Sequence, residues 1–316
     1  MKLALKIDVD TYRGTREGVP RLVEMLQRFE AHATFLFSLG PDHTGRAIKR
    51  AFRPGFMTKV SRTSVVEHYG VKTLLYGTLL PGPDIGRSCA DILRATRDAG
   101  LEVGIHSWDH VRWQDTAEHA DAEWTRSEMQ RAIDRYADIF GCEPKTHGAA
   151  GWQMNAHAMR LTQRLGFDYC SDTRGHCPFI PVQRAEIVAC PQLPTTLPTL
   201  DELIGRESIT VQNVHEYLLG VTQVVPEAGH VFTLHAELEG MRLAPVFERL
   251  LAGWREQGYE LTTTHEVLEN LNLDGLPRCE VVRGTVPGRS GTLMVQGEEF
   301  LRPRSRDVSE SIESVF

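Results

Sequence analysis

Leu101-Glu102-Val103-Gly104-Ile105-His106-Ser107-Trp108-Asp109-His110 is the stretch from which the fold is best predicted. Its first five residues form a short apolar run, which is typical of a buried strand. The two histidines follow directly and stand four residues apart, so both can point at one metal ion. Where strands alternate with helices, the C-terminal ends of the strands carry the chemistry. One such pair does not establish a metal site in a chain with 13 histidines, so its meaning depends on how the other strands end.

Short apolar runs alternate with amphipathic segments over most of the chain. The run at 3–9 is followed by apolar residues at helical spacing within 17–31 and by a second run at 34–39. About seven such runs predict a parallel α/β sheet that is closed, or nearly closed, into a barrel. We expect further strands near 101–105, 145–150, 167–171, 187–190, 229–235 and 259–263, and helices at 88–99, 117–140, 155–165, 211–223 and 244–257.

Three regions depart from this alternation. Residues 42–86 are too long for an ordinary connection between a strand and a helix, and they mix basic with apolar side chains. Residues 276–301 alternate weakly and contain Gly and Pro, which indicates a small β appendage, and residues 302–316 are charged and expected to be disordered. We therefore expect a barrel over residues 1–275 with an insertion at 42–86, followed by the appendage and the tail.

Composition excludes several classes of protein. The net charge of −7 argues against nucleic-acid binding, which depends on neutralising phosphates. The first residues already follow a strand pattern, without the apolar segment of a signal peptide, and no run approaches the about 20 apolar residues that span a bilayer. We therefore expect a cytoplasmic protein with reduced thiols, because no C-x-x-C pair occurs. The cysteines are Cys89, Cys142, Cys170, Cys177, Cys190 and Cys279.

Carboxylates and imidazoles follow several of the predicted strands. An isolated Asp after a strand is most often a turn residue, and an isolated His is most often structural. Their joint occurrence at successive strand ends is harder to explain in that way. Since these ends meet at one rim of a barrel, the set predicts a site of metal-assisted hydrolysis. The residues concerned are Asp8, Asp10, His106, His110, His147, Asp172, Arg174 and His235.

Three of these groups resemble the motifs of a known family. Asp8-Val9-Asp10, the pair His106-x-x-x-His110 and Leu234-His235 resemble, in order and spacing, motifs one, two and five of the polysaccharide deacetylases, the family 4 carbohydrate esterases. The resemblance covers roughly residues 1–270. It implies a distorted (β/α)7 barrel and a hydrolase that acts on the amide of an aminosugar.

The resemblance also implies a role for each residue of these motifs. Asp8 would be the general base, and Asp10, His106 and His110 would bind one divalent metal ion. His235 would be the general acid, on the opposite side of the rim, and would protonate the departing amine. Two imidazoles and one carboxylate leave coordination positions open, and they accept Zn²⁺, Co²⁺, Ni²⁺, Mn²⁺ or Fe²⁺.

The chain departs from the family pattern at motif three, which usually carries an Arg that holds the base. Here that strand end reads His147-Gly148-Ala149-Ala150, without an Arg. Arg174 is one candidate to reach Asp8 instead. Asp172 is a plausible counterpart of the motif-four Asp, and it is expected to hold His235 in its protonated form, since a nearby carboxylate favours an imidazolium.

Four stretches resemble one branch of this family. They are residues 6–11, 147–152, 171–175 and 233–240. The resemblance implies a substrate in which a formamido-sugar is linked to a polyprenyl phosphate, and deformylation at the cytoplasmic face of the inner membrane, in lipid A modification and polymyxin resistance. The alternative is an N-deacetylase of a polysaccharide or of peptidoglycan, because the residues themselves do not decide between formyl and acetyl groups.

The insertion at 42–86 has two interpretations. It is either a solvated basic loop over a small apolar cluster or a surface that meets an anionic polyprenyl phosphate and the membrane. Other enzyme classes are disfavoured because the chain has no G-x-S-x-G, H-E-x-x-H or G-x-x-x-x-G-K-[ST] motif. A non-catalytic barrel is also disfavoured, since the candidate base, ligands and acid are all present. The basic residues of the insertion are Arg46, Lys49, Arg50, Arg53, Lys59, Arg62 and Lys72.

Overall fold

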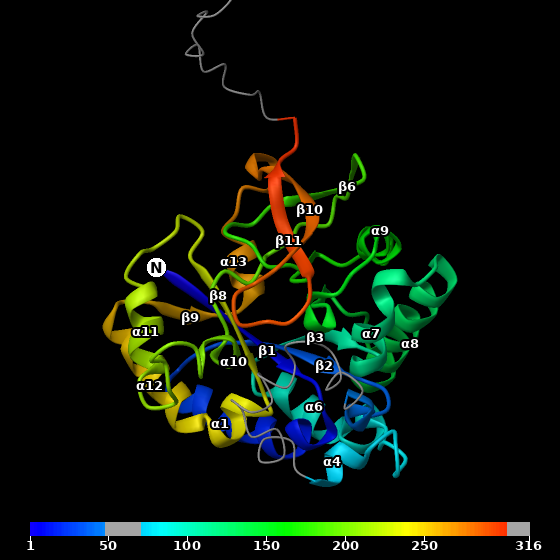
Figure 1. Ribbon diagram of the computed structural model, residues 1–316, viewed down its shortest axis with the longest axis horizontal. Helices are drawn as coiled ribbons and strands as arrows, with labels where there is room; N and C mark the ends of the chain where they lie inside the picture. Colours follow the sequence, from blue (N-terminus) through cyan, green and yellow to red (C-terminus); the bar gives the residue numbers. More distant parts are fainter. Residues whose placement is uncertain (48–70, 302–316) are drawn as a thin grey trace, which may run out of the picture.

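The computed structural model describes residues 1–47 and 71–301, and its core is a parallel sheet of seven strands (Figure 1). The strands follow the order β5-β4-β3-β2-β1-β8, and β9 pairs with the first residues of β1. The sheet curls into a partial barrel surrounded by helices, so the predicted α/β barrel is confirmed. The strands are β1 (Lys2–Val9), β2 (Thr34–Ser38), β3 (Glu102–Ser107), β4 (Thr146–His147), β5 (Tyr169–Cys170), β8 (His230–His235) and β9 (Glu260–Thr262).

Helices cover the outside of this sheet. Every residue of β1 after Lys2 is buried, as expected for a parallel strand that is covered on both faces. The longer helices are α1 (Val19–Arg28), α6 (Ala90–Asp98), α8 (Ala122–Phe140), α9 (Ala156–Arg164), α11 (Val214–Val221) and α12 (Ala244–Glu256). The short helical segments include α4 (Val71–Leu75), α5 (Ile85–Ser88), α7 (His110–Thr116), α10 (Leu200–Leu203), α13 (Thr264–Leu268) and the π-helical turns η1 (Gly14–Gly18) and η5 (Leu238–Arg242).

An irregular segment, residues 191–197, connects the two edge strands β5 and β8. Leu193 N donates to Cys170 O at 2.8 Å, and Thr196 N donates to Val231 O at 3.0 Å. The barrel is therefore completed here by loop backbone rather than by a direct pairing of β5 with β8. The expected barrel strand at 187–190 was wrong, because β7 (Glu186–Ile187) belongs to a different sheet.

The second sheet has four strands in the order β11-β10-β6-β7. Its hairpin of β10 (Arg278–Gly284) and β11 (Leu293–Glu299) pairs with β6 (Ile180–Gln183), which lies more than 90 residues earlier in the chain. The hairpin is attached to the barrel by Arg174, whose N–H donates to Met294 O at 2.9 Å and whose carbonyl accepts from Gln296 N at 2.7 Å. The C-terminal hairpin thus lies against the rim that carries the candidate site.

Of the insertion at 42–86, the structure describes 42–47 and 71–86. Its first residue is fixed to the rim, because the Asp42 carboxylate accepts a hydrogen bond from Tyr12 N at 2.9 Å. Most of its basic residues lie outside the described part of the chain, as do all residues of the expected tail at 302–316. No helix in the described part is both long and apolar enough to cross a bilayer.

Candidate metal centre and active site

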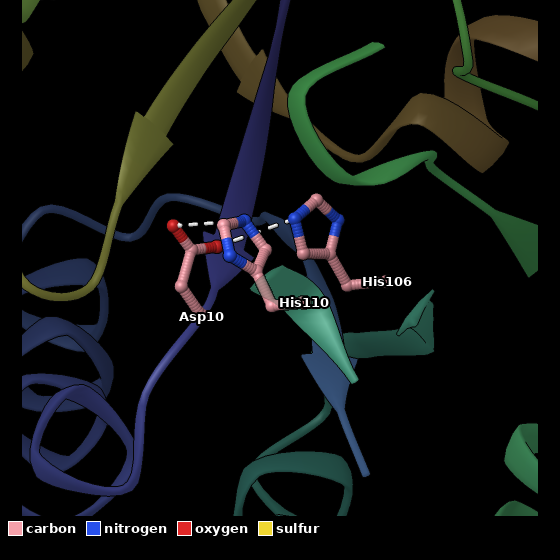
Figure 2. A group of neighbouring side chains, drawn as sticks. All are labelled: Asp10, His106 and His110. Atoms are coloured by element: carbon pink, nitrogen blue, oxygen red, sulfur yellow. Dashed lines mark ion pairs between the residues drawn. The ribbon is translucent and has the colours of Figure 1, made fainter. Parts of the chain in front are cut away.

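The C-terminal ends of β1 and β3 bring Asp10, His106 and His110 together (Figure 2). Asp10 Oδ1 is 3.2 Å from His106 Nε2, and Asp10 Oδ2 is 3.3 Å from His110 Nε2. His106 lies in β3 and His110 is the first residue of α7, so the turn between them sets the four-residue spacing. Asp10 and His106 are buried and His110 is partly exposed, which leaves the trio accessible on the His110 side.

Local hydrogen bonds orient both imidazoles. His106 Nδ1 donates to Gly148 O at 2.7 Å, which fixes the ring with its Nε2 facing Asp10. Asp109 starts the helix that carries His110, because its side chain accepts from Arg112 N at 3.0 Å. The other oxygen of Asp109 lies 2.5 Å from Nδ1 of His43, at the beginning of the insertion. Sequence reasoning had found no role for Asp109.

Glu237 holds the loop that carries Asp10. Its Oε1 accepts hydrogen bonds from Asp10 N at 3.0 Å, from Thr11 N at 2.7 Å and from Thr11 Oγ1 at 2.9 Å. Burial, together with the charge of Asp10, raises the pKa of Glu237 well above its usual value. Although burial alone would raise it, His110 and His106 hold the pKa of Asp10 well below its usual range. Asp10 is therefore the ionised carboxylate of this pair.

The donor atoms of Asp10, His106 and His110 fit a divalent cation. Donors that lie about 2.0–2.2 Å from one ion are about 3 Å apart, and each imidazole lies 3.2 or 3.3 Å from an oxygen of Asp10. Asp10 Oδ1 is buried and accepts no hydrogen bond from the described residues, and His106 Nε2 faces it. A cation between the two atoms would satisfy both. Two imidazoles and one carboxylate suit Zn²⁺ or another first-row metal ion.

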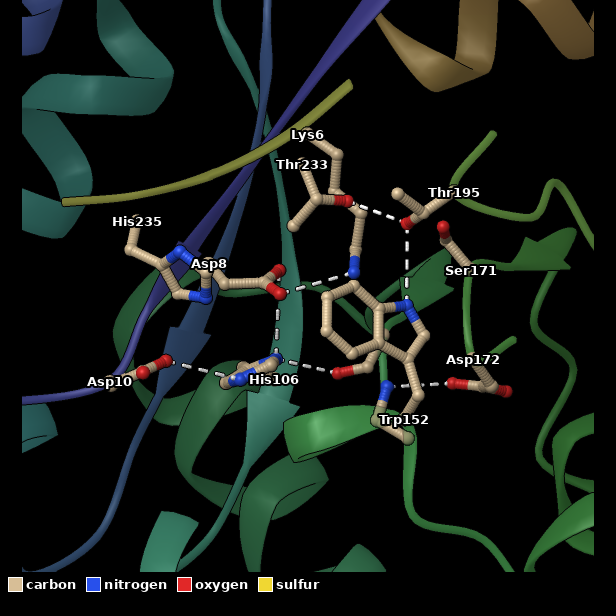
Figure 3. Close-up of polar contacts among 12 residues, drawn as sticks. Lys6, Asp8, Asp10, His106, Trp152, Ser171, Asp172, Thr195, Thr233 and His235 are labelled. Carbon is tan, nitrogen blue, oxygen red and sulfur yellow. Dashed lines mark hydrogen bonds and ion pairs between the residues drawn. The ribbon is translucent and has the colours of Figure 1, made fainter. Parts of the chain in front are cut away.

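Asp8 is held by Lys6, a residue that sequence reasoning missed (Figure 3). Lys6 Nζ is 3.2 Å from Asp8 Oδ2, and the Lys6 side chain is fully buried. It also lies over the Trp152 ring, 5.1 Å from the ring centroid. A lysine inside an apolar strand, two residues before Asp8, points to the same face, and this was the available signal. Lys6 therefore makes the contact with Asp8 that was expected of the missing motif-three Arg.

His235 is next to Asp8 and not across the rim from it. Strands β1 and β8 are hydrogen-bonded neighbours, and Asp8 and His235 are partners in their register. The backbone N–H of His235 donates to Glu239 Oε2 at 2.8 Å. Burial raises the pKa of Glu239 to about 7, and the proximity of His235 lowers it by less. The expected separation of base and acid was wrong because β8 follows β1 directly in the sheet.

Asp172 does not contact His235. Its Oδ1 accepts hydrogen bonds from His147 Nδ1 at 2.7 Å and from Ala149 N at 2.8 Å, and its Oδ2 accepts from Gln192 Nε2 at 3.2 Å. It is completely buried and lies just after the end of β5. The expected pairing of Asp172 with His235 was wrong, because both Asp172 oxygens are bound to His147, Ala149 and Gln192 instead.

Arg174 does not reach Asp8 either. Its Nη1 contacts Glu202 Oε1 at 2.6 Å, its Nη2 donates to Leu197 O at 2.9 Å and its Nε donates to Thr195 O at 3.3 Å. Two of the three guanidinium nitrogens are thus bound to residues 191–197, and the third is bound to Glu202 on α10. Arg174 stabilises that segment, and the hypothesis that it holds Asp8 was wrong.

The polysaccharide deacetylase family model matches residues 3–170 of this chain. The chain belongs to the polysaccharide deacetylase family. It is accordingly a hydrolase of amide C–N bonds. It is 38% identical over 304 residues to the "Probable 4-deoxy-4-formamido-L-arabinose-phosphoundecaprenol deformylase ArnD" of Shewanella sediminis, covering 96% of this chain and 97% of the relative. A protein of the same name from Wigglesworthia glossinidia brevipalpis is 30% identical over 285 residues, covering 90% and 98%.

Among solved structures, a putative polysaccharide deacetylase from Mycobacterium smegmatis shares the fold. The two chains superpose with a TM-score of 0.59 at 17% sequence identity, over 90% of this chain and 94% of the other. At this identity the likeness concerns the fold alone. The curled parallel sheet described above is thus shared by the two structures.

Proposed function

We propose that this polysaccharide deacetylase removes the formyl group from a 4-deoxy-4-formamido-L-arabinose linked to a polyprenyl phosphate, releasing formate and the free aminosugar. The names of the two relatives with 38% and 30% identity support this substrate. The proposed chemistry rests on the trio of Asp10, His106 and His110. Asp8 and His235, which are partners in the pairing of β1 with β8, lie beside this trio. In this role the chain acts in lipid A modification and polymyxin resistance.

Asp10, His106 and His110 would hold one divalent metal ion. When bound, such an ion polarises the formamide carbonyl and lowers the pKa of a water molecule. Asp8 accepts the proton of the attacking water. Its Oδ1 suits this task, because it is buried and has no hydrogen-bond donor among the described residues, while Lys6 holds Oδ2.

His235 donates a proton to the nitrogen that leaves. An amine is a poor leaving group until it is protonated, so hydrolysis of a formamide needs an acid as well as a base. Because His235 is the register partner of Asp8, both act from adjacent strands on one substrate group. Lys6, fixed by Trp152, keeps the Asp8 carboxylate in one orientation.

The substrate is tested with two matched compounds, the formamido- and the acetamido-sugar on the same short polyprenyl phosphate. We expect formate release and at least tenfold less acetate release from the metal-loaded enzyme. Faster release of acetate would replace the proposal by N-deacetylation. Release of neither acid, from an enzyme that contains metal, would reject both substrates.

The role of Asp8 is tested with Asp8→Asn. The variant keeps the shape of the side chain but has no basic carboxylate, so turnover should fall by about 10²- to 10⁴-fold while the metal content stays unchanged. Formate release and metal analysis of the same sample measure both quantities. Normal turnover in this variant would remove Asp8 from the role of base.

Association with an anionic membrane completes the proposal. The named relatives carry a lipid-linked substrate in their name, and the described end of the insertion exposes Leu79 and Leu80, of which Leu79 is 81% accessible. We expect the protein to sediment with liposomes that contain anionic lipid, less so with neutral liposomes, and still less when residues 46–76 are removed. Full sedimentation of the shortened protein with anionic liposomes would contradict this part.

A further inference from the structure

Three cationic side chains surround one indole next to Asp8. Lys6 Nζ lies 5.1 Å from the centroid of the Trp152 ring, Arg174 Cζ lies 5.0 Å from it and Arg289 Cζ lies 4.3 Å from it. Cations over an indole face are attracted by the ring quadrupole, which holds them at a fixed position. The contacts of Lys6 and Arg174 are accounted for above, since Lys6 holds Asp8 and Arg174 holds the connecting segment. Arg289 has no comparable assignment.

Arg174 and Arg289 share Glu202 but differ in their remaining contacts. Both guanidinium groups lie 2.6 Å from Glu202 Oε1, Arg174 through Nη1 and Arg289 through Nε. All three nitrogens of Arg174 are bonded to protein acceptors. Arg289 Nη2 is 4.0 Å from the Asp201 carboxylate. Among the described residues, neither Nη1 nor Nη2 has a hydrogen-bond acceptor, and neither atom is fully buried. Its outer edge is therefore available to a ligand.

The loop that carries Arg289 is fixed on the candidate site. It connects β10 with β11, and Figure 1 shows it in orange running toward α10. Gly288 has φ +87° and packs so closely on α10 that a Cβ there would lie 2.1 Å from Glu202 O. Although burial opposes it, Asp201 and Glu202 keep the pKa of Arg289 above its usual value. The guanidinium is thus charged, and it shares the Trp152 ring with Lys6, which contacts Asp8.

We propose that Arg289 forms an anion-binding site that takes the phosphate group of the substrate while the formamide lies at Asp8. The inference rests on the proposed function, in which the sugar carries a phosphodiester. A guanidinium offers paired N–H donors to phosphate oxygens, and its Nε contact with Glu202 keeps the plane of the group fixed. The site selects for a substrate that is charged at the end of the sugar remote from the amide.

The experiment compares a short-chain polyprenyl phosphodiester of the formamido-sugar with its uncharged methyl glycoside, in the metal-loaded enzyme. In Arg289→Gln we expect KM for the phosphodiester to rise about 10- to 100-fold, with kcat changed only a few-fold. Kinetic constants for the methyl glycoside should not change. Arg289→Lys, which keeps the charge but not the paired donors, should recover part of the loss.

Two controls separate binding from folding. Arg278→Gln makes the same chemical change on the same hairpin, at an exposed position, and should leave both substrates unaffected. Inorganic phosphate, titrated by calorimetry, should bind the native enzyme at least tenfold more tightly than Arg289→Gln. An equal loss on both substrates, or equal phosphate binding, would overturn the anion site. Release of formate from neither substrate by the native enzyme would reject the proposed function, while phosphate binding still decides the role of Arg289.

Discussion

Two clusters of imidazole and carboxylate groups lie at the ends of neighbouring strands, and proximity alone does not distinguish them. In each cluster the candidate ligand atoms lie within 4.8 Å of one another. The rim cluster consists of Asp10, His106 and His110, and the interior cluster consists of His147, Cys170 and Asp172. Their difference lies in how completely the protein itself satisfies the polar atoms.

The interior cluster is saturated. Both oxygens of Asp172 accept hydrogen bonds from the protein, and burial raises the pKa of the Cys170 thiol well above its usual value, which keeps it protonated. In the rim cluster, Asp10 Oδ1 is buried without a hydrogen bond from the described residues. A buried polar atom without a partner is costly, so it indicates a missing ligand. Between these two clusters, an unsatisfied carboxylate oxygen, rather than a short distance, identifies the candidate metal site.

The largest expected difference between the clusters is in metal binding. His106→Ala should abolish metal binding and lower formate release more than about a thousandfold, because transition-state stabilisation by the ion is worth several kcal/mol. His147→Ala should keep one metal ion per folded chain. Metal analysis of both purified variants, with the folded fraction measured by circular dichroism, checks this. Loss of metal from His147→Ala alone would reverse the assignment of the two clusters.

The next difference concerns stability. Asp172→Ala leaves the donors on His147, Ala149 and Gln192 without their acceptor in the interior, and should lower the free energy of unfolding by about 3–5 kcal/mol. Asp172→Asn keeps the shape and should cost less, with turnover of the folded protein within a few-fold of the native value. Urea unfolding and formate release measure the two effects. A stable Asp172→Asn variant without turnover would restore the catalytic role that the sequence suggested.

Much of the fold and the rim cluster could be predicted because both depend on local patterns. The apolar runs of β1, β3 and β8 are followed directly by Asp10, His106 and His235, and parallel strands bring such ends to one rim. Helix limits were less exact, since α8 begins at Ala122, where Asp121 caps it, and not at residue 117.

The partners of Asp172 and Arg174 could not be predicted in the same way. Both depend on where residues 191–203 run, and that segment has no periodic pattern from which its path could be read. Long side chains such as Arg174 reach whichever carboxylate the tertiary structure places nearby, in this case Glu202 on α10. Glu239, by contrast, follows His235 by four residues, which is a helical spacing that could have drawn attention to it.

The smallest expected effect extends the comparison to Glu239, which also has an unsatisfied buried atom at the rim, Oε1. Burial raises the pKa of Glu239 from 4.5 to about 7. The folded protein therefore keeps a proton on Glu239 that the unfolded chain releases above pH 4.5. The stabilisation that comes from this bound proton is complete below pH 4.5 and is lost as the pH rises to about 7. The rise in pKa corresponds to about 3 kcal/mol. Between pH 5 and pH 8, the free energy of unfolding of the native protein should fall by up to that amount relative to Glu239→Gln. The Gln side chain does not ionise and still accepts the His235 N–H.

Urea unfolding at both pH values measures the difference, and Glu123→Gln, at an exposed position on α8, is the control. Parallel pH dependence of the native protein and Glu239→Gln would mean that the carboxylate is already satisfied, and the rim would then resemble the interior cluster at this residue.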